Sequence, residues 1–382
     1  MMQRVFLWFF SLLALYVSGF ACATEEPPLP PDEKPAPHIA LLLPLKSAAF
    51  APAADAVRLG FLAAAGVEVT DPRSLPVRVY GCFDEGKDIV ALYRQAVAGG
   101  ARAVVGPLTR NGVATLAAEK ILPVPTLALN VADQAASPQL YFFGMALEAE
   151  ARQTAKITRR QGAHQAIVVT VNTQLSRRLQ TAFAEEFTAL GGTVLSEIEF
   201  DGDPAAFADI ADQANTVVFL AADAATARLV RPYLPNRMPI HATSQIFVGN
   251  ANTLINNDLE RIRFVDMPWL LQPDHPAVMI YPRAAPPLAA DNERFYALGI
   301  DAFRLIHILL EGRTLDALPL DGVSGHIDLD HHIFLRSAIP ATFVQGHAQL
   351  PNMPATIVPM FPGLMSASSV PASAVPETAP PQ

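Results

Sequence analysis

Residues 261–271 read RIRFVDMPWLL, and their side chains alternate as expected for an extended segment. Ile262 and Phe264 fall on one face of this segment, and Val265 falls on the other. The alternation breaks at Pro268, which has no backbone N–H to donate to a neighbouring strand. This pattern predicts a strand that ends where the chain crosses from one part of the molecule back to another.

A regular alternation of strands and helices precedes this segment and predicts a first lobe. The apolar run at residues 38–45 is typical of a strand that is covered on both faces. Strands that alternate with helices form parallel sheets wrapped by helices. The strands are predicted at 38–45, 77–83, 101–107 and 124–130, with helices at 51–65, 87–98 and 112–120.

A second series of the same kind follows and predicts a second lobe. Two successive series joined by crossings predict an α/β fold of two Rossmann-like lobes with parallel sheets and a cleft between them. We expect residues 38–145 plus 268–316 in the first lobe and residues 146–267 plus 317–350 in the second. The second series has predicted helices at 147–160, 173–190, 205–213 and 222–233, and predicted strands at 166–171, 193–200, 216–220 and 239–243.

Both ends of the sequence have compositions that do not build a core. Residues 1–23 have the layout of an export signal, with Arg4, an apolar run and then small residues. A transmembrane anchor is the alternative for this stretch. Residues 24–37 are rich in proline and predict an extended tether, and residues 351–382, rich in Pro, Ala and Ser, are expected to be disordered.

The two cysteines of the chain predict an anchor and a buried thiol. Cys22 ends the apolar run and is the predicted site of lipidation, although cleavage by an ordinary signal peptidase after Ala23 remains an alternative. Cys82 lies in a predicted strand and is expected to be a buried free thiol. No disulfide framework is therefore expected.

Composition narrows the class of protein. The 382 residues are 51% hydrophobic and 16% charged, which is enough apolar material for large cores. The formal net charge is -9, so neither nucleic acid nor anionic lipid is expected as the main partner, because either would need a basic face. The sequence has no nucleophile elbow, zinc-protease helix, phosphate-binding loop or paired metal-binding cysteines, so we expect neither an enzyme nor a cofactor.

Several motifs resemble a known family. VVGPLT at 104–109 and VPTLALN at 124–130 resemble the type I periplasmic binding protein fold. More specifically, DMPWLL at 266–271, ALGIDAFRL at 297–305 and DGVSGHIDLD at 321–330 resemble the LppC/LpoA-like family of outer-membrane lipoproteins that activate penicillin-binding proteins.

This resemblance implies a regulator. It implies a lipid-anchored protein on the periplasmic face of the outer membrane, or a soluble periplasmic one, that docks on a class A penicillin-binding protein and regulates peptidoglycan synthesis. Such activation needs only a higher affinity for the active conformation of the partner. The alternative is a solute-binding protein that delivers a small polar ligand, such as an amino acid, to an ABC importer by hinge closure.

In such a fold a ligand binds at the carboxyl ends of the strands, where helix N-termini offer free N–H groups. The residues at these positions are Ser47, Thr109 and Asn130. In related amino-acid binders these loops hold the ligand carboxylate with hydroxyls and amides. The competing interpretation is that these side chains only cap the helices that follow.

Three further positions have two interpretations each. Trp269 could line the cleft or pack in the core, and the apolar residues after it favour the core. Asp301, inside an apolar helix, is expected to brace the backbone of the crossing segment. His326, Asp328, Asp330 and His332 share one face of an extended segment and invite a zinc site, but the residues of one strand are too far apart to surround an ion, so we favour a solvated hairpin.

Overall fold

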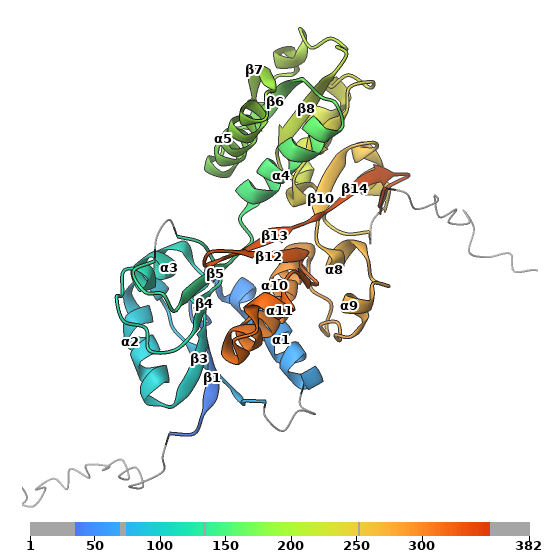
Figure 1. Cartoon of the computed structure of the whole chain (residues 1–382). Helices are drawn as coiled ribbons and strands as arrows, with labels where there is room; N and C mark the ends of the chain where they lie inside the picture. Colours follow the sequence, from blue (N-terminus) through green and yellow to red (C-terminus); the bar gives the residue numbers. More distant parts are fainter. Residues whose placement is uncertain (1–34, 69–73, 133–134, 251–252, 352–382) are drawn as a thin grey trace, which may run out of the picture. The chain divides into compact units, whose positions relative to one another are not determined.

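The computed structural model describes residues 35–68, 74–132, 135–250 and 253–351 (Figure 1). The predicted export signal with Cys22, nearly all of the tether and nearly all of the tail lie outside the described residues. The chain divides into residues 1–36 and 37–382, and every element below belongs to the second unit.

An eight-stranded sheet forms what we call the first lobe, with strand order β11-β12-β13-β5-β4-β3-β1-β2. Neighbours from β13 to β2 are parallel, and β11, β12 and β13 pair antiparallel. The strands are β1 (His38–Leu43), β2 (Val77–Gly81), β3 (Ala101–Val105), β4 (Thr126–Ala128), β5 (Leu140–Phe143), β11 (Leu320–Asp321), β12 (His326–Asp330) and β13 (Ile333–Ser337).

Helices cover both faces of this sheet. One apolar cluster joins the sheet to α1 (Ala51–Glu68) and α10 (Ala290–Glu311), and a second joins its other face to α2 (Glu85–Ala98) and α3 (Arg110–Ala117). Helices α1 and α10 touch through glycines: a Cβ at Gly60 would overlap the carbonyl oxygen of Tyr296, and one at Gly299 would overlap that of Val57.

A seven-stranded sheet forms the second lobe, with order β15-β14-β10-β9-β8-β6-β7. Helices α4 (Leu147–Arg160) and α5 (Gln174–Ala189) pack on one face and α6 (Ala224–Val230) on the other. The strands are β6 (Gln165–Val171), β7 (Thr193–Phe200), β8 (Thr216–Ala221), β9 (Ile240–Ala242), β10 (Arg263–Asp266), β14 (Ile339–Val344) and β15 (His347–Gln349).

Short helices complete the described fold. They are η1 (Pro204–Phe207), η2 (Arg231–Tyr233), η3 (Ser244–Ile246), α7 (Thr253–Asn256), η4 (Asn257–Leu259), α8 (Pro268–Leu271), α9 (Pro276–Met279) and α11 (Thr314–Ala317). None of the helices within the described ranges combines the length and the apolar character that crossing a membrane would require.

The chain passes between the two lobes three times: from β5 to α4, from β10 to α8, and from β13 to β14. The third crossing corrects the predicted domain division, which placed all of residues 317–350 in the second lobe. Strands β11 to β13 belong to the first sheet, because Ile327 and Phe334 are buried in its core and β13 pairs with β5. Only β14 and β15 belong to the second sheet.

The predicted α/β fold of two lobes is confirmed, and its sheets are mostly parallel, with the C-terminal strands added as antiparallel hairpins. One predicted helix differs from the structure. The helix predicted at 205–213 is only the 3₁₀ turn η1, because it buries one side chain, Phe207, while its following residues stay largely exposed.

The segment at 261–271 is also divided differently than predicted. It holds the four-residue strand β10 and then α8, with Pro268 at the first helical position, where its missing N–H removes no helical hydrogen bond.

Candidate functional site

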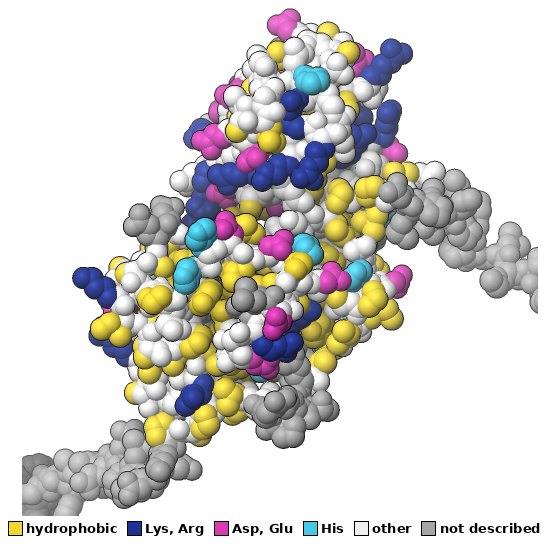
Figure 2. All heavy atoms as spheres, in the orientation of Figure 1, with side chains coloured by type: hydrophobic (Ala, Val, Ile, Leu, Met, Phe, Trp, Pro, Cys, Tyr) yellow, Lys and Arg dark blue, Asp and Glu magenta, His cyan; other side chains and the backbone are white. Residues whose placement is uncertain are grey.

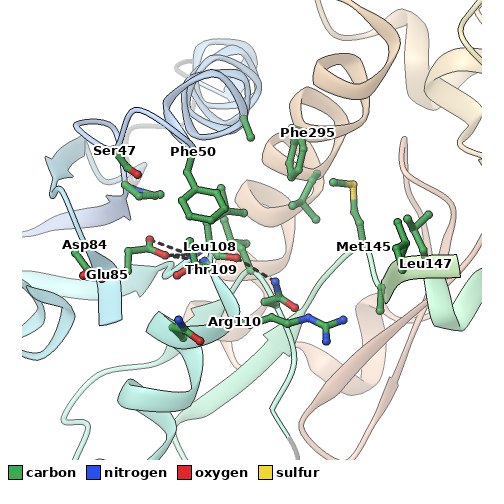
Figure 3. A pocket seen from close by; sticks show the side chains of 18 of the residues that line it. Ser47, Phe50, Asp84, Glu85, Leu108, Thr109, Arg110, Met145, Leu147 and Phe295 are labelled. Carbon is green, nitrogen blue, oxygen red and sulfur yellow. Dashed lines mark hydrogen bonds between the residues drawn. The ribbon is translucent and has the colours of Figure 1, made fainter. Parts of the chain in front are cut away.

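A pocket of about 700 Å³ lies at the carboxyl ends of β1, β3 and β4 (Figure 3). The loops that leave these strands form one wall, and the N-terminal parts of α4 and α5 contribute Leu147, Glu148, Leu175 and Arg178. The pocket is therefore built from both lobes.

The three residues predicted from the sequence to hold a ligand all line this pocket. Thr109 caps α3, because its hydroxyl oxygen accepts the Gly112 N–H at 3.2 Å. The Asn130 amide donates to the Leu108 carbonyl at 3.1 Å and accepts from the Val131 N–H at 3.0 Å. The Ser47 carbonyl accepts the N–H groups of Phe50 and Ala51 ahead of α1. The hydrogen bonds of Thr109 are thus those of a helix cap, and the hydrogen bonds of Asn130 are those of a residue that stabilises its loop.

Glu85 is the pocket residue that the sequence analysis missed. It begins α2, is 2% exposed, and receives the Leu108 N–H at 3.0 Å and the Thr109 N–H at 2.6 Å (Figure 3). Burial raises the pKa of the Glu85 carboxyl, and these backbone hydrogen bonds oppose the rise. The spacing of 23 residues between Glu85 and Leu108 gave no local pattern that could have revealed the contact.

One ion cluster joins the two lobes at the pocket. Glu148, near the start of α4, lies 2.9 Å from Arg110 of α3 and 3.0 Å from Arg178 of α5. Burial alone would raise the pKa of Glu148, but its own backbone N–H and the two arginines outweigh this effect, so the pKa is lowered. The carboxylate therefore stays charged and links α3 to the second lobe.

Apolar side chains make up much of the remaining lining. Phe50 lies near Glu85 and Thr109, and Phe295 and Met145 line the side of the pocket farther from Glu85 (Figure 3). A concave, largely apolar space with a few polar groups is typical of small-molecule sites.

Trp269, the fourth predicted cleft residue, does not line this pocket. It is fully buried in the core of the first lobe, and its indole N–H donates to Glu293 at 2.5 Å. The guanidinium of Arg283 lies 3.7 Å from the ring centroid. The structure thus favours the core interpretation.

Buried charges concentrate where the chain crosses between lobes. Arg294 of α10 pairs with Asp266 at the end of β10 at 2.6 Å, and it also donates to the carbonyls of Ser244 and Phe247 in the second lobe. Burial raises the pKa of the Asp266 carboxyl, and the Arg294 guanidinium acts against this rise. The pair holds the second crossing in place.

A second pair holds the third crossing. Arg336 of β13 lies 2.7 Å from Glu150 of α4, and both side chains are 4% exposed. The amide of Gln153, one turn further along α4, bonds both the N–H and the carbonyl of Ala338. Side chains of α4 therefore fix the position of the segment that leads from β13 to β14.

Asp301 does brace a backbone segment, but this segment is the loop at Val323 and Ser324 and not the predicted crossing segment. Its fully buried carboxylate accepts the N–H groups of Val323 and Ser324 and the Ser324 hydroxyl, at 3.1, 2.7 and 2.6 Å. The motif at 321–330 is therefore a loop folded around a buried charge, followed by a hairpin.

The hairpin has an exposed side and a buried side, and Cys82 is buried. In β12, His326 and Asp328 are exposed and Ile327 is buried. Across the described ranges, no group of three or more His, Cys, Asp or Glu side chains is placed to hold a metal ion. Cys82 is a free buried thiol whose pKa is raised to about 11, chiefly by burial and then by nearby carboxylates.

The surface has an uneven distribution of charge. On the face shown in Figure 2, Lys and Arg side chains gather over α4 and the adjoining end of α5. Arg152, Lys156 and Arg160 are the exposed basic residues of α4, spaced four residues apart on one side of the helix. This basic face stands out on a chain with a net charge of -9.

The curated relatives of this chain are penicillin-binding protein activators. The activator LpoA of Haemophilus influenzae is 27% identical over 308 residues, which are 77% of this chain and 51% of that protein. The chain thus spans about half the length of the curated relatives it matches.

Solved structures of two kinds share the fold. The C-domain of H. influenzae LpoA, described as a regulator of PBP1A, matches with a TM-score of 0.68 and 24% identity, covering 81% of this chain and 98% of that one. A Chromobacterium violaceum structure described as a putative branched-chain amino acid ABC transporter matches with a TM-score of 0.69 and 39% identity, covering 81% of this chain and 100% of that one.

The sequence profile of one family covers most of the described fold. It is the family described as LppC putative lipoprotein, and it matches residues 32–214 and 205–339. These stretches include the first lobe, the three crossings and all of the second lobe before β14. The chain therefore belongs to the LppC lipoprotein family.

Proposed function

We propose that this protein docks on a class A penicillin-binding protein and favours the active state of that peptidoglycan synthase. The observation that carries the proposal is the match to the LpoA C-domain over 98% of that domain, together with curated relatives named as penicillin-binding protein activators. Activation of this kind requires only that the docked protein bind the active conformation of its partner more tightly. It requires no reaction at this chain.

The buried pairs at the crossings support a docking role. Glu150–Arg336 and Asp266–Arg294 tie the two lobes together through groups that are almost inaccessible to water. Separating either pair inside the protein would leave an unpaired buried charge, which is strongly unfavourable. A module held in this way presents a constant surface to a partner, which lowers the entropy lost on docking.

The exposed basic face of α4 is our candidate for the docking surface. Complementary charge accelerates association and excludes wrong partners. Because the rest of the chain is acidic overall, this face would direct an acidic patch of the synthase to the second lobe.

A reconstituted glycan polymerisation assay tests the proposal. The purified synthase is measured alone and with the exported form of this protein, and binding is measured by co-precipitation. Arg152→Glu with Arg160→Glu is compared with Arg78→Glu with Arg102→Glu, two exposed arginines on strands of the first lobe. We expect stimulation by the wild type and by the first-lobe control, and loss of binding in the α4 variant. Absence of both binding and stimulation by the wild type would refute the proposal.

A proposal on the location rests on the same family match. We propose that Cys22 is lipidated and anchors the protein to the outer membrane, facing the periplasm, because family members are described as lipoproteins. Mass spectrometry of the protein isolated from membranes, compared with Cys22→Ser, tests this. A mature N-terminus without acyl chains would contradict it.

A second function is favoured by two observations. The 39% identical structure described as a putative branched-chain amino acid ABC transporter and the pocket of about 700 Å³ together suggest a solute-binding protein. A saturable rise in melting temperature with L-leucine, without stimulation of the synthase, would support this function in place of the first.

A further inference from the structure

The pocket contains a carboxylate of the chain itself. Glu85 reaches from the start of α2 to the N-terminal end of α3, where both of its oxygens lie within 3.1 Å of the Leu108 N–H and one lies 2.6 Å from the Thr109 N–H. The side chain is 2% exposed although it borders a cavity. Neither docking nor catalysis accounts for a buried acid at this position.

The arrangement is that of an occupied carboxylate site. Two successive backbone N–H groups at the junction of a strand and a helix converge on one anion, and the helix dipole adds to the attraction. Gly112 in the first turn of α3 provides the space, because a Cβ there would lie 2.6 Å from the Cβ of Glu85. The backbone and the glycine together shape a position for a carboxylate group.

Beyond this position the pocket has apolar side chains beside its polar and charged ones. Phe50, Leu129 and Phe295 line the same cavity and would contact the hydrocarbon part of a ligand whose carboxylate took the place of the Glu85 side chain. An aliphatic carboxylate, free amino acids included, is the chemical class that fits these two parts of the pocket.

We infer that Glu85 occupies the carboxylate-binding position of this pocket, so that the native protein excludes amino acids and other small carboxylates, and that removing the side chain opens a site for aliphatic carboxylates. Glu85 is thus a specificity-determining residue. The inference does not rest on activation of a synthase, because it concerns binding by the isolated protein.

Chemical rescue of Glu85→Ala tests the inference. The substitution removes the equivalent of acetate, so acetate and isocaproate should raise the melting temperature of the variant in a saturable way, whereas sodium chloride at equal ionic strength should not. Isocaproamide, which has the same shape without the charge, serves as the matched probe. In calorimetry we expect the variant to bind isocaproate roughly tenfold or more tightly than it binds the amide, since the charge-assisted hydrogen bonds are lost with the amide.

The matched control variant is Asp84→Ala. Asp84 is the neighbouring carboxylate on the pocket wall and accepts the Gly86 N–H at 3.0 Å, so its loss should weaken α2 without creating an anion site. Glu85→Ser serves as a second variant if Glu85→Ala does not fold. Saturable binding of L-leucine or isocaproate by the wild type would overturn the inference, and so would folded Glu85 variants that respond to no carboxylate.

Discussion

At the scale of single residues, two buried ion pairs lie where the chain crosses between the lobes. Arg294 has two acidic partners with contrasting surroundings: Asp266, which is fully buried, and Asp291, whose side chain is 89% exposed. Buried pairs and exposed pairs differ in what their loss costs, because only the buried one leaves an unsolvated charge behind. The two partners of one arginine therefore form a natural comparison.

We expect Asp266→Ala to lower the free energy of unfolding by about 3–5 kcal/mol, because Arg294 would remain charged and buried. Asp291→Ala should lower it by about 1 kcal/mol or less. Urea unfolding of both variants measures the two values. Equal losses would show that the depth of Asp266 has no energetic consequence.

A second residue links stability to pH. His241 is buried beside Arg263, and its pKa is lowered from 6.5 to about 3, first by burial and then by the charge of Arg263. The unfolded chain takes up this proton below the ordinary pKa while the folded chain does not. The stability is therefore full above the ordinary pKa of histidine and declines as the pH falls toward about 3.

Between about pH 7.5 and about pH 5.5 this residue should remove about 1.4 kcal/mol of stability. In His241→Gln the fall in stability over the same range should be smaller by that amount, while the other titrating groups still contribute. Chemical unfolding of both proteins at the two pH values measures the difference. Identical pH dependence would assign the effect to other groups.

At the scale of elements, the contact between α1 and α10 depends on glycine. A Cβ at Gly299 would overlap a backbone carbonyl, which cannot rotate away as a side chain could. Gly66 of α1, by contrast, has open space at its Cβ position, with nothing within 4 Å. The same substitution should thus have opposite effects at the two sites.

We expect Gly299→Ala to destabilise the protein by roughly 1–3 kcal/mol or more, because the two helices must separate. Gly66→Ala should be stabilising by up to about 1 kcal/mol, since alanine favours the helix and meets no obstacle. Thermal and urea unfolding compare the variants. A stabilised Gly299→Ala would contradict the close packing of α1 against α10.

The same scale shows what the sequence can predict. Local periodicity placed the helix predicted at 173–190 within one residue of α5, and the strand predicted at 77–83 at β2, which ends two residues earlier. These elements could be predicted because their apolar spacing is local. The extra helix at 205–213 was wrong because that stretch lacks a wide enough apolar face.

The candidate site was only partly predictable for the same reason. Ser47, Thr109 and Asn130 do meet at the pocket, because strand ends of a parallel sheet share one edge. Glu85 contacts Thr109 across 24 residues, and Arg336 contacts Glu150 across 186, and neither pairing leaves a periodic trace in the sequence. The sequence also did not reveal that β13 belongs to the first sheet. A hairpin pattern shows that two strands pair with each other, but it does not show which other strand lies next to them.

At the scale of the whole molecule, neither lobe is made from one continuous segment. The stretch from β11 to β15 supplies three strands to the first sheet and then two to the second. Phe343 of β14 is fully buried against Phe247 and Phe264 in the second lobe. The end of the described fold is therefore part of the second core.

Ending the chain after Ser337 should destabilise the second lobe selectively. The truncation removes β14, exposes the edge of β10 and leaves a cavity in place of Phe343. Hydrogen exchange should show faster exchange in β8, β9 and β10, with smaller changes in β1 and β3. A chain ended after Pro351 serves as the control and should keep the exchange pattern of the full chain.

The threefold passage between lobes has a consequence for how the protein is made. A chain that emerges N-terminus first presents β1 to β5 long before β13, the neighbour of β5, becomes available. The edge of β5 that pairs with β13 therefore remains unpaired until the whole second series of strands and helices has emerged. Chaperones that cover exposed strand edges would be needed most during this interval, and not after folding is complete.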